Sequence, residues 1–498
     1  MQNTLILGMV FATLVGAIVT LITTRYNRLD RWIAFGAALI SWGCSVAVLI
    51  QVFGGEIQTY RLGGYIPPFG IVLVVDRLAA IFAVMASSVL MAGFIYTIHC
   101  HDKCTSYPAF IPLFLFMHTG LMGTLITGDL FTFFVFMEIM VLSSVSLVAI
   151  SDDHLGLEAA FKYLFISAIG SLLLLISVSM LYAALGTLNM ADMARLLISE
   201  NPPLVRGAAL MLTCASLLKS AVFPFHFWQP DFHTTAPTPV HAVLSSVVVK
   251  VGIYMILRIV TLLFIEDAAA VSEIFVVMGV IGVFFGSFGA LRTYNGKRLL
   301  AYSTIGQIGF ILLGIGWGTP LGLVAAIVYA FNHAFVKSAL LMVFGLVSSR
   351  TSPKSADFKD IGGAGRLMPP IIGVLWMVGG MALAGIPPMN GFISKLAIIQ
   401  SGVDVGDFLP LFLVVFGGIL TVTYVFRTWQ HVFQQHNPDL KLHIKPYGDG
   451  VLAPTLLIGM CVLLGVYARP LVALAQLAVV QLQDPTNYIN AVRLFTGG

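Results

Sequence analysis

The sequence has 498 residues, of which 58% are hydrophobic and only 10% are charged. Because soluble domains carry about 25% charged residues, this composition and the mean hydropathy of +0.96 exclude a soluble globular protein and predict an all-α integral membrane protein. A net charge of +4 does not indicate nucleic-acid binding, and the five cysteines do not indicate a disulfide framework.

Apolar segments follow one another along the chain, each near the length of about 20 residues that a helix needs to cross a bilayer. There are fourteen, at residues 3–23, 32–53, 78–99, 108–127, 130–151, 159–184, 206–226, 238–262, 270–291, 299–318, 320–349, 369–398, 407–432 and 449–473. No Lys or Arg precedes the first segment, so we expect a retained helix rather than a secretory signal peptide. The segments 320–349 and 369–398 are long enough to be tilted or interrupted, and Gly385-Ile386-Pro387-Pro388 predicts an interruption in the second.

The basic residues between the segments predict an orientation. Links after odd-numbered segments carry fourteen Lys and Arg, whereas links after even-numbered segments, with the C-terminal tail, carry six. The positive-inside rule then puts both termini outside the plasma membrane and the link 350–368 in the cytoplasm. Among the outer links, 55–77 predicts a small hairpin and 189–199 predicts an amphipathic helix on the membrane surface.

The stretch 212–250 carries two lysines within apolar sequence. Lys219 lies in the interior of one predicted apolar helix, which Pro224 then breaks, and Lys250 lies inside the next. An ionisable side chain within a membrane span is costly and is therefore a functional candidate. The alternative is a pair of lysines that snorkel from helix ends, which fits Lys250 poorly because long apolar sequence flanks it on both sides.

Glu138 is the one carboxylate that falls clearly inside a predicted span. It can balance the charge of only one buried lysine. The remaining lysines lack an acidic partner within a span, which favours proton exchange over fixed ion pairs. Sodium prefers an all-oxygen site, so this composition favours proton transfer over sodium binding.

Further candidates lie in the second half of the chain. His333 and Lys337 are four residues apart and share one helix face, although a histidine alone in a core is more often structural. Lys395 follows the Pro387-Pro388 interruption and is the candidate end of a proton path. Arg258 and Arg427 lie nearer helix ends and are interpreted as snorkelling or structural.

The sequence contains little that indicates metal or cofactor binding. The segment 99–104 reads HCHDKC, but a structural zinc site needs four ligands and no second Cys/His pair is evident in the short links. We therefore expect a solvated loop, no metal and no cofactor; no phosphate loop, dinucleotide fingerprint or haem motif occurs.

Five segments carry a resemblance to a family: TGDLFTFFVFMEIMVLSS, LLKSAVFPFHFWQPDFHTTAPTPVHAVLSSVVVKVGIY, GKRLLAYSTIGQIGF, NHAFVKSALL and AGIPPMNGFISK. With them, essentially the whole chain resembles the antiporter-like subunits shared by respiratory complex I, membrane-bound hydrogenases and Mrp-type sodium/proton antiporters. The resemblance implies fourteen helices, of which 7 and 12 are broken, and two inverted five-helix repeats. The implied parts are an N-terminal region 1–107, repeats 108–262 and 263–432, and a last helix with a short outer tail in 433–498. It also implies a proton relay of Glu138, Lys219, Lys250, His333, Lys337 and Lys395.

The branch of this family is suggested by the tail DPTNYINAV, which resembles that of the D subunit of Mrp-type antiporters. That branch implies an ion-transporting subunit, not an enzyme, with protons, sodium and the other subunits of a membrane complex as partners. Three alternatives remain: the equivalent subunit of complex I or a membrane hydrogenase, a stand-alone transporter of a solute such as bicarbonate or a metal ion, and a structural scaffold.

Overall fold

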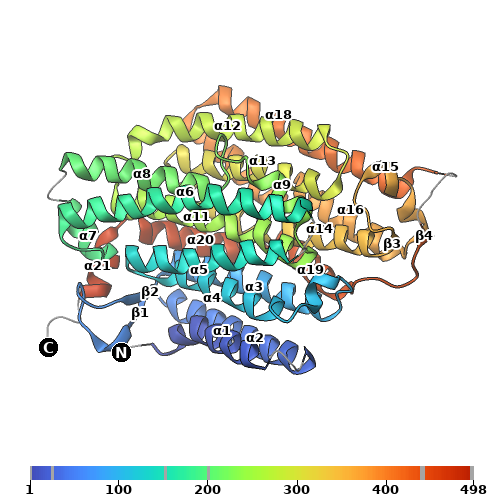
Figure 1. Ribbon diagram of the computed structural model, residues 1–498. Helices are drawn as coiled ribbons and strands as arrows, with labels where there is room; N and C mark the ends of the chain where they lie inside the picture. Colours follow the sequence, from blue (N-terminus) through green and yellow to red (C-terminus); the bar gives the residue numbers. More distant parts are fainter. Residues whose placement is uncertain (1–2, 24–26, 151–153, 199–201, 438–442, 494–498) are drawn as a thin grey trace.

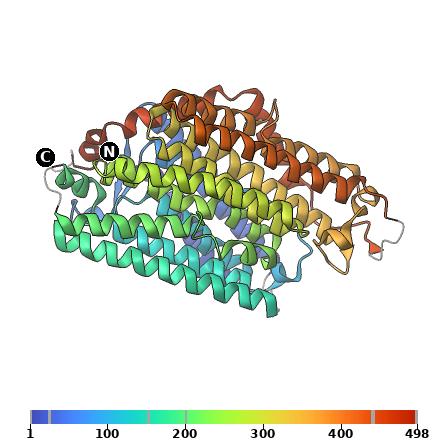
Figure 2. The same ribbon diagram turned by 90° about the horizontal axis from the view of Figure 1, so that it is seen from above.

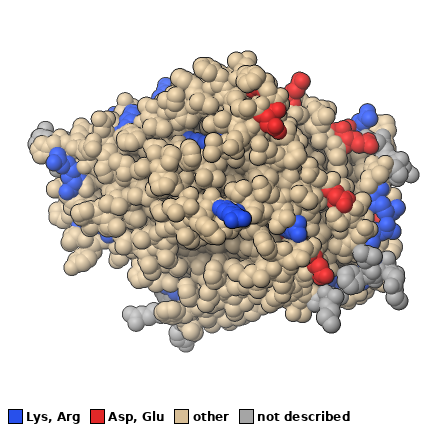
Figure 3. Space-filling view, turned by 180° about the vertical axis from the view of Figure 1, so that it is seen from behind, with Lys and Arg blue, Asp and Glu red and all other residues tan. Residues whose placement is uncertain are grey.

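The structure is a computed structural model that describes residues 3–23, 27–150, 154–198, 202–437 and 443–493. Its long helices run roughly along one common direction (Figure 1; Figure 2). Large apolar side chains such as Phe161 and Phe165 are exposed on the outer helices, and most of the face in Figure 3 carries no charged side chain. A helix satisfies its own backbone hydrogen bonds, and this apolar exterior suits a multi-pass membrane protein.

Ten helices in the described part of the chain are long and apolar enough to span a membrane. They are α1 (Leu5–Ile22), α2 (Asn27–Phe53), α3 (Arg77–Ile98), α5 (Leu130–Ala149), α6 (His154–Leu185), the continuous series α10 (Thr238–Val243), η3 (Leu244–Val248), α11 (Val249–Arg258) and η4 (Ile259–Leu263), then α12 (Ala268–Arg292), α13 (Gly296–Gly316), α14 (Pro320–Ser349), and α18 (Phe408–Trp429) continued by η6 (Gln430–Gln434). The 30-residue α14 is uninterrupted, so its length calls for tilt rather than a break.

The other predicted segments are short or divided. Helices α4 (Phe110–Ile126) and α8 (Pro203–Lys219) each have 17 residues. At about 1.5 Å per residue, such a helix is a few ångströms shorter than the hydrocarbon core. The predicted interruption at 385–388 is present, because α16 (Pro370–Ala384) ends there and α17 (Asn390–Val405) begins beyond it. Hence, within the described ranges, ten spans rather than fourteen meet the criteria of length and apolarity as single helices.

The C-terminal region differs from the expected single helix at 449–473 with a short tail. Helix α19 (Leu452–Val466) meets α20 (Arg469–Leu482) at an angle of 77°, and the two count as an eleventh span if they form one broken crossing. Pro470 lies in the first turn of α20, where its fixed φ favours a new helix start. A further helix, α21 (Pro485–Arg493), follows, so the expected tail is largely helical.

Small elements lie at the two ends of the bundle (Figure 1). The predicted hairpin is present as β1 (Gln58–Arg61) and β2 (Val72–Val75), antiparallel with Gln58 opposite Val75. The predicted surface helix is α7 (Met190–Leu197), which shares this end with α21. Strands β3 (Thr351–Ser352) and β4 (His443–Ile444) pair at the opposite end. The remaining short elements are η1 (Leu62–Gly64), η2 (Lys103–Ser106), α9 (Gln229–Thr235), α15 (Phe358–Ile361) and η5 (Ala364–Leu367).

Candidate functional site

Glu138 on α5 and Lys219 on α8 both approach α6. The distance from Lys219 Nζ to Glu138 Oε1 is 4.0 Å, and their side chains are 7% and 27% exposed respectively. Lys219 Nζ donates to Ser167 Oγ at 2.6 Å and to Ser171 Oγ at 3.1 Å. The Ser171 hydroxyl also donates to Glu138 Oε1. The structure therefore brings the predicted acid and lysine together, but through two serines that the sequence did not single out.

Lys219 is the last residue of α8, seven residues earlier than the expected end of this span. Ala221 has φ 52°, a left-handed conformation that turns the chain away from the helix. The freed carbonyls remain satisfied: Leu218 O accepts from Trp228 Nε1 at 3.2 Å, and Leu217 O accepts from Val222 N at 3.1 Å. A lysine at a helix C-terminus is favoured by the helix dipole, so this break holds a cation within the bundle.

Lys250 is completely buried in α11. Its Nζ lies 2.7 Å from His333 Nδ1 on α14, and it donates to Ser245 O at 3.3 Å. Close contact with α8 depends on Gly252, because a Cβ at this position would collide with Ser216 O of that helix. The predicted His333 is therefore the direct partner of a buried lysine.

Lys337 is also fully buried, four residues after His333 on α14. It donates from Nζ to Leu300 O on α13 at 2.9 Å. The two predicted residues thus face different partners, although they share one helix.

Lys395 lies in the second turn of α17, and its Nζ reaches the interruption, where it donates to Ala384 O at the end of α16 at 2.7 Å. The ammonium also lies 5.5 Å from the centre of the Phe310 ring. The approach of the two helices requires glycine at position 391, because a Cβ there would lie 1.8 Å from Ala382 O. The lysine therefore satisfies a carbonyl that the helix break leaves free.

Between His333 and Lys395 the helices carry further polar side chains that the sequence analysis did not select. Tyr329 Oη donates to Gln307 Oε1, and Asn332 Nδ2 donates to Ser394 Oγ at 2.9 Å. A cavity of ≈10 Å³ lies among these side chains and His333. Its size is about that of one water molecule. The signal for these polar residues in the sequence is weak, because single Asn, Gln and Tyr residues are common in helices.

Arg258 is a structural residue rather than a snorkelling one. Its guanidinium pairs with the Asp76 carboxylate through two contacts of 2.6 Å, and both side chains are 2% exposed. The Tyr488 ring from α21 lies 5.3 Å away. Asp76 precedes α3 and caps it by accepting from Ala79 N at 2.9 Å. Arg427 donates to Leu291 O and lies 4.7 Å from the Tyr294 ring, so it too contacts protein groups.

The segment 99–104 forms ion pairs and hydrogen bonds. Within the described ranges, no group of three or more His, Cys, Asp and Glu side chains could hold a metal. Lys354 Nζ donates to Asp102 Oδ2 at 2.6 Å. Burial raises the pKa of Asp102, but the nearby Lys354 outweighs it and leaves that pKa below its ordinary value. This loop is therefore joined to the link after α14.

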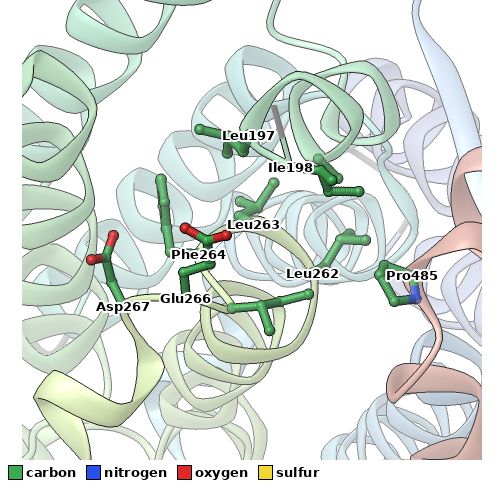
Figure 4. Close-up of a pocket in the computed structure, with 10 residues that line it drawn as sticks. Leu197, Ile198, Leu262, Leu263, Phe264, Glu266, Asp267 and Pro485 are labelled. Atoms are coloured by element: carbon green, nitrogen blue, oxygen red, sulfur yellow. The ribbon is translucent and has the colours of Figure 1, made fainter. Parts of the chain in front are cut away.

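An apolar pocket of ≈190 Å³ lies away from these groups, between α7, the loop after η4 and Pro485 (Figure 4). Leucine and isoleucine make up five of its ten lining residues, and Glu266 and Asp267 line it from the loop after η4. None of the six predicted relay residues lines it.

Comparison with known proteins places the chain in a family. Residues 127–421 match the family model described as NADH:quinone oxidoreductase/Mrp antiporter, TM. The D subunit of the Na(+)/H(+) antiporter of Alkalihalophilus pseudofirmus is 30% identical over 497 residues, which are 99% of each chain. The chain belongs to the family of Mrp antiporter D subunits.

Solved structures confirm the antiporter-like fold for this member of the D-subunit family. A chain in the structure of the Mrp complex from Dietzia sp. DQ12-45-1b has a TM-score of 0.90 and 26% identity, covering 98% of this chain and 99% of that one. A chain of the membrane-bound sulfane sulfur reductase, an archaeal respiratory membrane complex, has a TM-score of 0.91 and 28% identity, covering 98% of this chain and 100% of that one.

Proposed function

We propose that this chain is the proton-translocating D subunit of a multisubunit sodium/proton antiporter. The observation that carries the proposal is a series of basic groups, buried on α8, α11 and α14 and half-buried on α17, with the Glu138 carboxylate beside the first of them. The full-length similarity to the D subunit of a Na(+)/H(+) antiporter supports it. Buried ionisable groups inside membrane helices are costly and commonly mark proton or ion paths.

In this proposal the proton moves along Glu138, Lys219, Lys250, His333, Lys337 and Lys395. At 4.0 Å, the Glu138–Lys219 attraction is of order 4 kcal/mol at an effective dielectric constant of about 20. One arriving proton removes that attraction, so the pair can change the protonation of the lysines beyond it. The 2.7 Å contact between Lys250 and His333 supports a transfer in the middle of the path.

The proposed partners are the other subunits of an Mrp-type complex. Glu138 lies within α5, a candidate span, yet its side chain is 27% exposed. A carboxylate is costly against lipid, so a neighbouring subunit is expected to cover this part of α5. Sodium-dependent exchange by the purified chain alone in liposomes would contradict a need for partners.

We also propose fourteen crossings, with inverted repeats at 108–262 and 263–432 and both termini outside the plasma membrane. The fourteen apolar segments of the sequence and the bias of basic residues between them support this arrangement. An impermeant thiol reagent should label Asn490→Cys but not Lys354→Cys in sealed cells of a background that lacks other reactive thiols. Labelling of Lys354→Cys would show that the link 350–368 lies outside and that the proposed orientation is wrong.

A second candidate is the corresponding subunit of a respiratory membrane complex. The TM-score of 0.91 with a chain of the sulfane sulfur reductase favours it. The two functions differ in what drives transport: exchange by an antiporter needs only ion gradients, whereas a respiratory complex needs electron transfer.

The test of the main proposal is sodium/proton exchange in everted membrane vesicles that contain the whole complex. Glu138→Ala and Lys219→Ala should each abolish exchange, whereas the amount of assembled complex stays near that of the parent. Parent-like exchange in both variants would overturn the relay.

A further inference from the structure

The ammonium group of Lys219 is fully hydrogen-bonded by a single helix. An ammonium has three N–H donors. Lys219 Nζ has three acceptors on α6: Ser167 O at 3.1 Å, Ser167 Oγ at 2.6 Å and Ser171 Oγ at 3.1 Å. The α6 serines, rather than Glu138, therefore fix where this lysine lies.

Glu138 contacts the same helix from α5. Its Oε1 accepts a hydrogen bond from Ser171 Oγ and lies 4.0 Å from Lys219 Nζ. Hydrogen bonds between nitrogen and oxygen are about 2.7–3.2 Å long, so the acid and the lysine do not bond directly. Ser171 is the one side chain in the described structure that is hydrogen-bonded to both.

The sequence of α6 suits this position. Ser167 and Ser171 are four residues apart and so share a face. Gly170 lies beside them, where a Cβ would be 3.0 Å from Leu218 Cδ2 and 3.3 Å from Lys219 Cε. Small residues on this face therefore let α8 come close enough for its lysine to reach both hydroxyls.

A serine in a helix often has only a structural role, in which its hydroxyl donates to a nearby backbone carbonyl. Ser177 on the same helix is such a case, because it donates to Ala208 O on α8 at 2.7 Å. Ser171 also lies 3.0 Å from Ser167 O, but it has only one hydrogen to donate. That hydrogen can point to Glu138, which connects the acid to Lys219 through Ser171, or to the Ser167 backbone carbonyl, which breaks this connection.

We propose that Ser171 is a proton bridge between Lys219 and Glu138, held in register by Ser167; this rests on the relay function proposed above. In the step, a Lys219 N–H bond breaks as that proton joins Ser171 Oγ, and the Ser171 O–H bond breaks as its proton joins Glu138 Oε1. The products are a neutral amine, an unchanged serine and a protonated carboxyl group. The opposite charges cancel without either side chain crossing the 4.0 Å gap.

The test compares serine variants on α6 in everted vesicles that contain the assembled complex. Ser171→Ala should lower the maximal exchange rate by about tenfold or more, a modest loss for a proton-transfer group because water can partly replace a hydroxyl. The sodium concentration for half-maximal exchange should stay unchanged. Ser171→Thr, which keeps the hydroxyl, should recover most of the rate, and the matched control Ser177→Ala should exchange like the parent.

The rates are expressed per assembled complex. If Ser171→Ala does not assemble, Ser171→Cys takes its place, since it keeps a similar volume but offers only a weak S–H donor. A parent-like rate in the alanine or cysteine variant, alongside inactive Lys219→Ala and Glu138→Ala, would overturn the bridge and leave the relay intact. Parent-like exchange in those last two variants would overturn the relay itself.

Discussion

The bundle contains two pairs of an acid and a base, one buried and one half-buried, that are built in opposite ways. Arg258 and Asp76 make two direct contacts of 2.6 Å, and each side chain is 2% exposed. Lys219 and Glu138 are 4.0 Å apart, with a hydroxyl between them and the acid 27% exposed. The direct contacts of the first pair indicate a fixed ion pair, whereas the gap in the second leaves room for its hydrogen bonds to change.

The choice of base agrees with this difference. Arginine keeps its proton and matches a carboxylate through two parallel hydrogen bonds, which suits a permanent connection between α11 and the start of α3. Lysine can lose its proton when it is buried. The first pair is therefore expected to control stability, and the second is expected to control transport.

The largest expected effect is on stability, from Asp76→Ala. This change leaves the buried Arg258 guanidinium unpaired, which costs about 3–5 kcal/mol, and it also removes the cap of α3. Thermal unfolding of the purified complex and the yield of assembled complex measure the loss.

A double variant sharpens this result. Arg258→Met combined with Asp76→Leu removes both charges and should recover part of the lost stability, because an apolar pair can replace a buried ion pair. Normal assembly of Asp76→Ala with lost exchange would show instead that this pair takes part in transport.

A smaller effect on stability, but a large one on transport, is expected from Lys395→Ala. Its ammonium donates to the backbone at Ala384 O, so its loss should cost only about 1 kcal/mol. Exchange should nevertheless be lost, because the proposed path ends at this lysine. The matched control is Lys359→Ala, at an exposed lysine. Near-normal exchange in assembled Lys395→Ala would make that lysine structural.

The smallest effect is expected at the surface pair Asp102–Lys354, whose side chains are 13% and 47% exposed. Lys354 holds the pKa of Asp102 below its ordinary value, against the opposing effect of burial. The contribution of Asp102 to stability is therefore present above its unfolded pKa and is lost as pH falls through the folded one. We expect this contribution to be less than about 1 kcal/mol. It is measured as the difference in stability between the parent and Asp102→Asn, and this difference should disappear below about pH 4. A difference that persists below both pKa values would contradict this origin.

The sequence predicted what depends on local pattern. Long apolar segments located the helices, and Gly385 with two prolines located the break before Lys395. The lysines themselves stood out because charge is rare in such segments.

What the sequence could not predict depends on contacts between distant segments. Asp76 lies 182 positions from Arg258, and it looked like an ordinary loop residue before a helix. Ser171 was one of four serines in α6, and only the approach of α5 and α8 distinguishes it. The bend between α19 and α20 escaped notice because apolar sequence continues on both sides of it.

The central claim is that Lys219 must release a proton, whereas Arg258 must not. The most direct test is Lys219→Arg, measured as sodium/proton exchange in everted vesicles with assembled complex determined in parallel. Arginine keeps the positive charge but does not give up its proton. We predict normal assembly with little or no exchange. Exchange as fast as in the parent would mean that Lys219 is a fixed charge, and it would contradict the account.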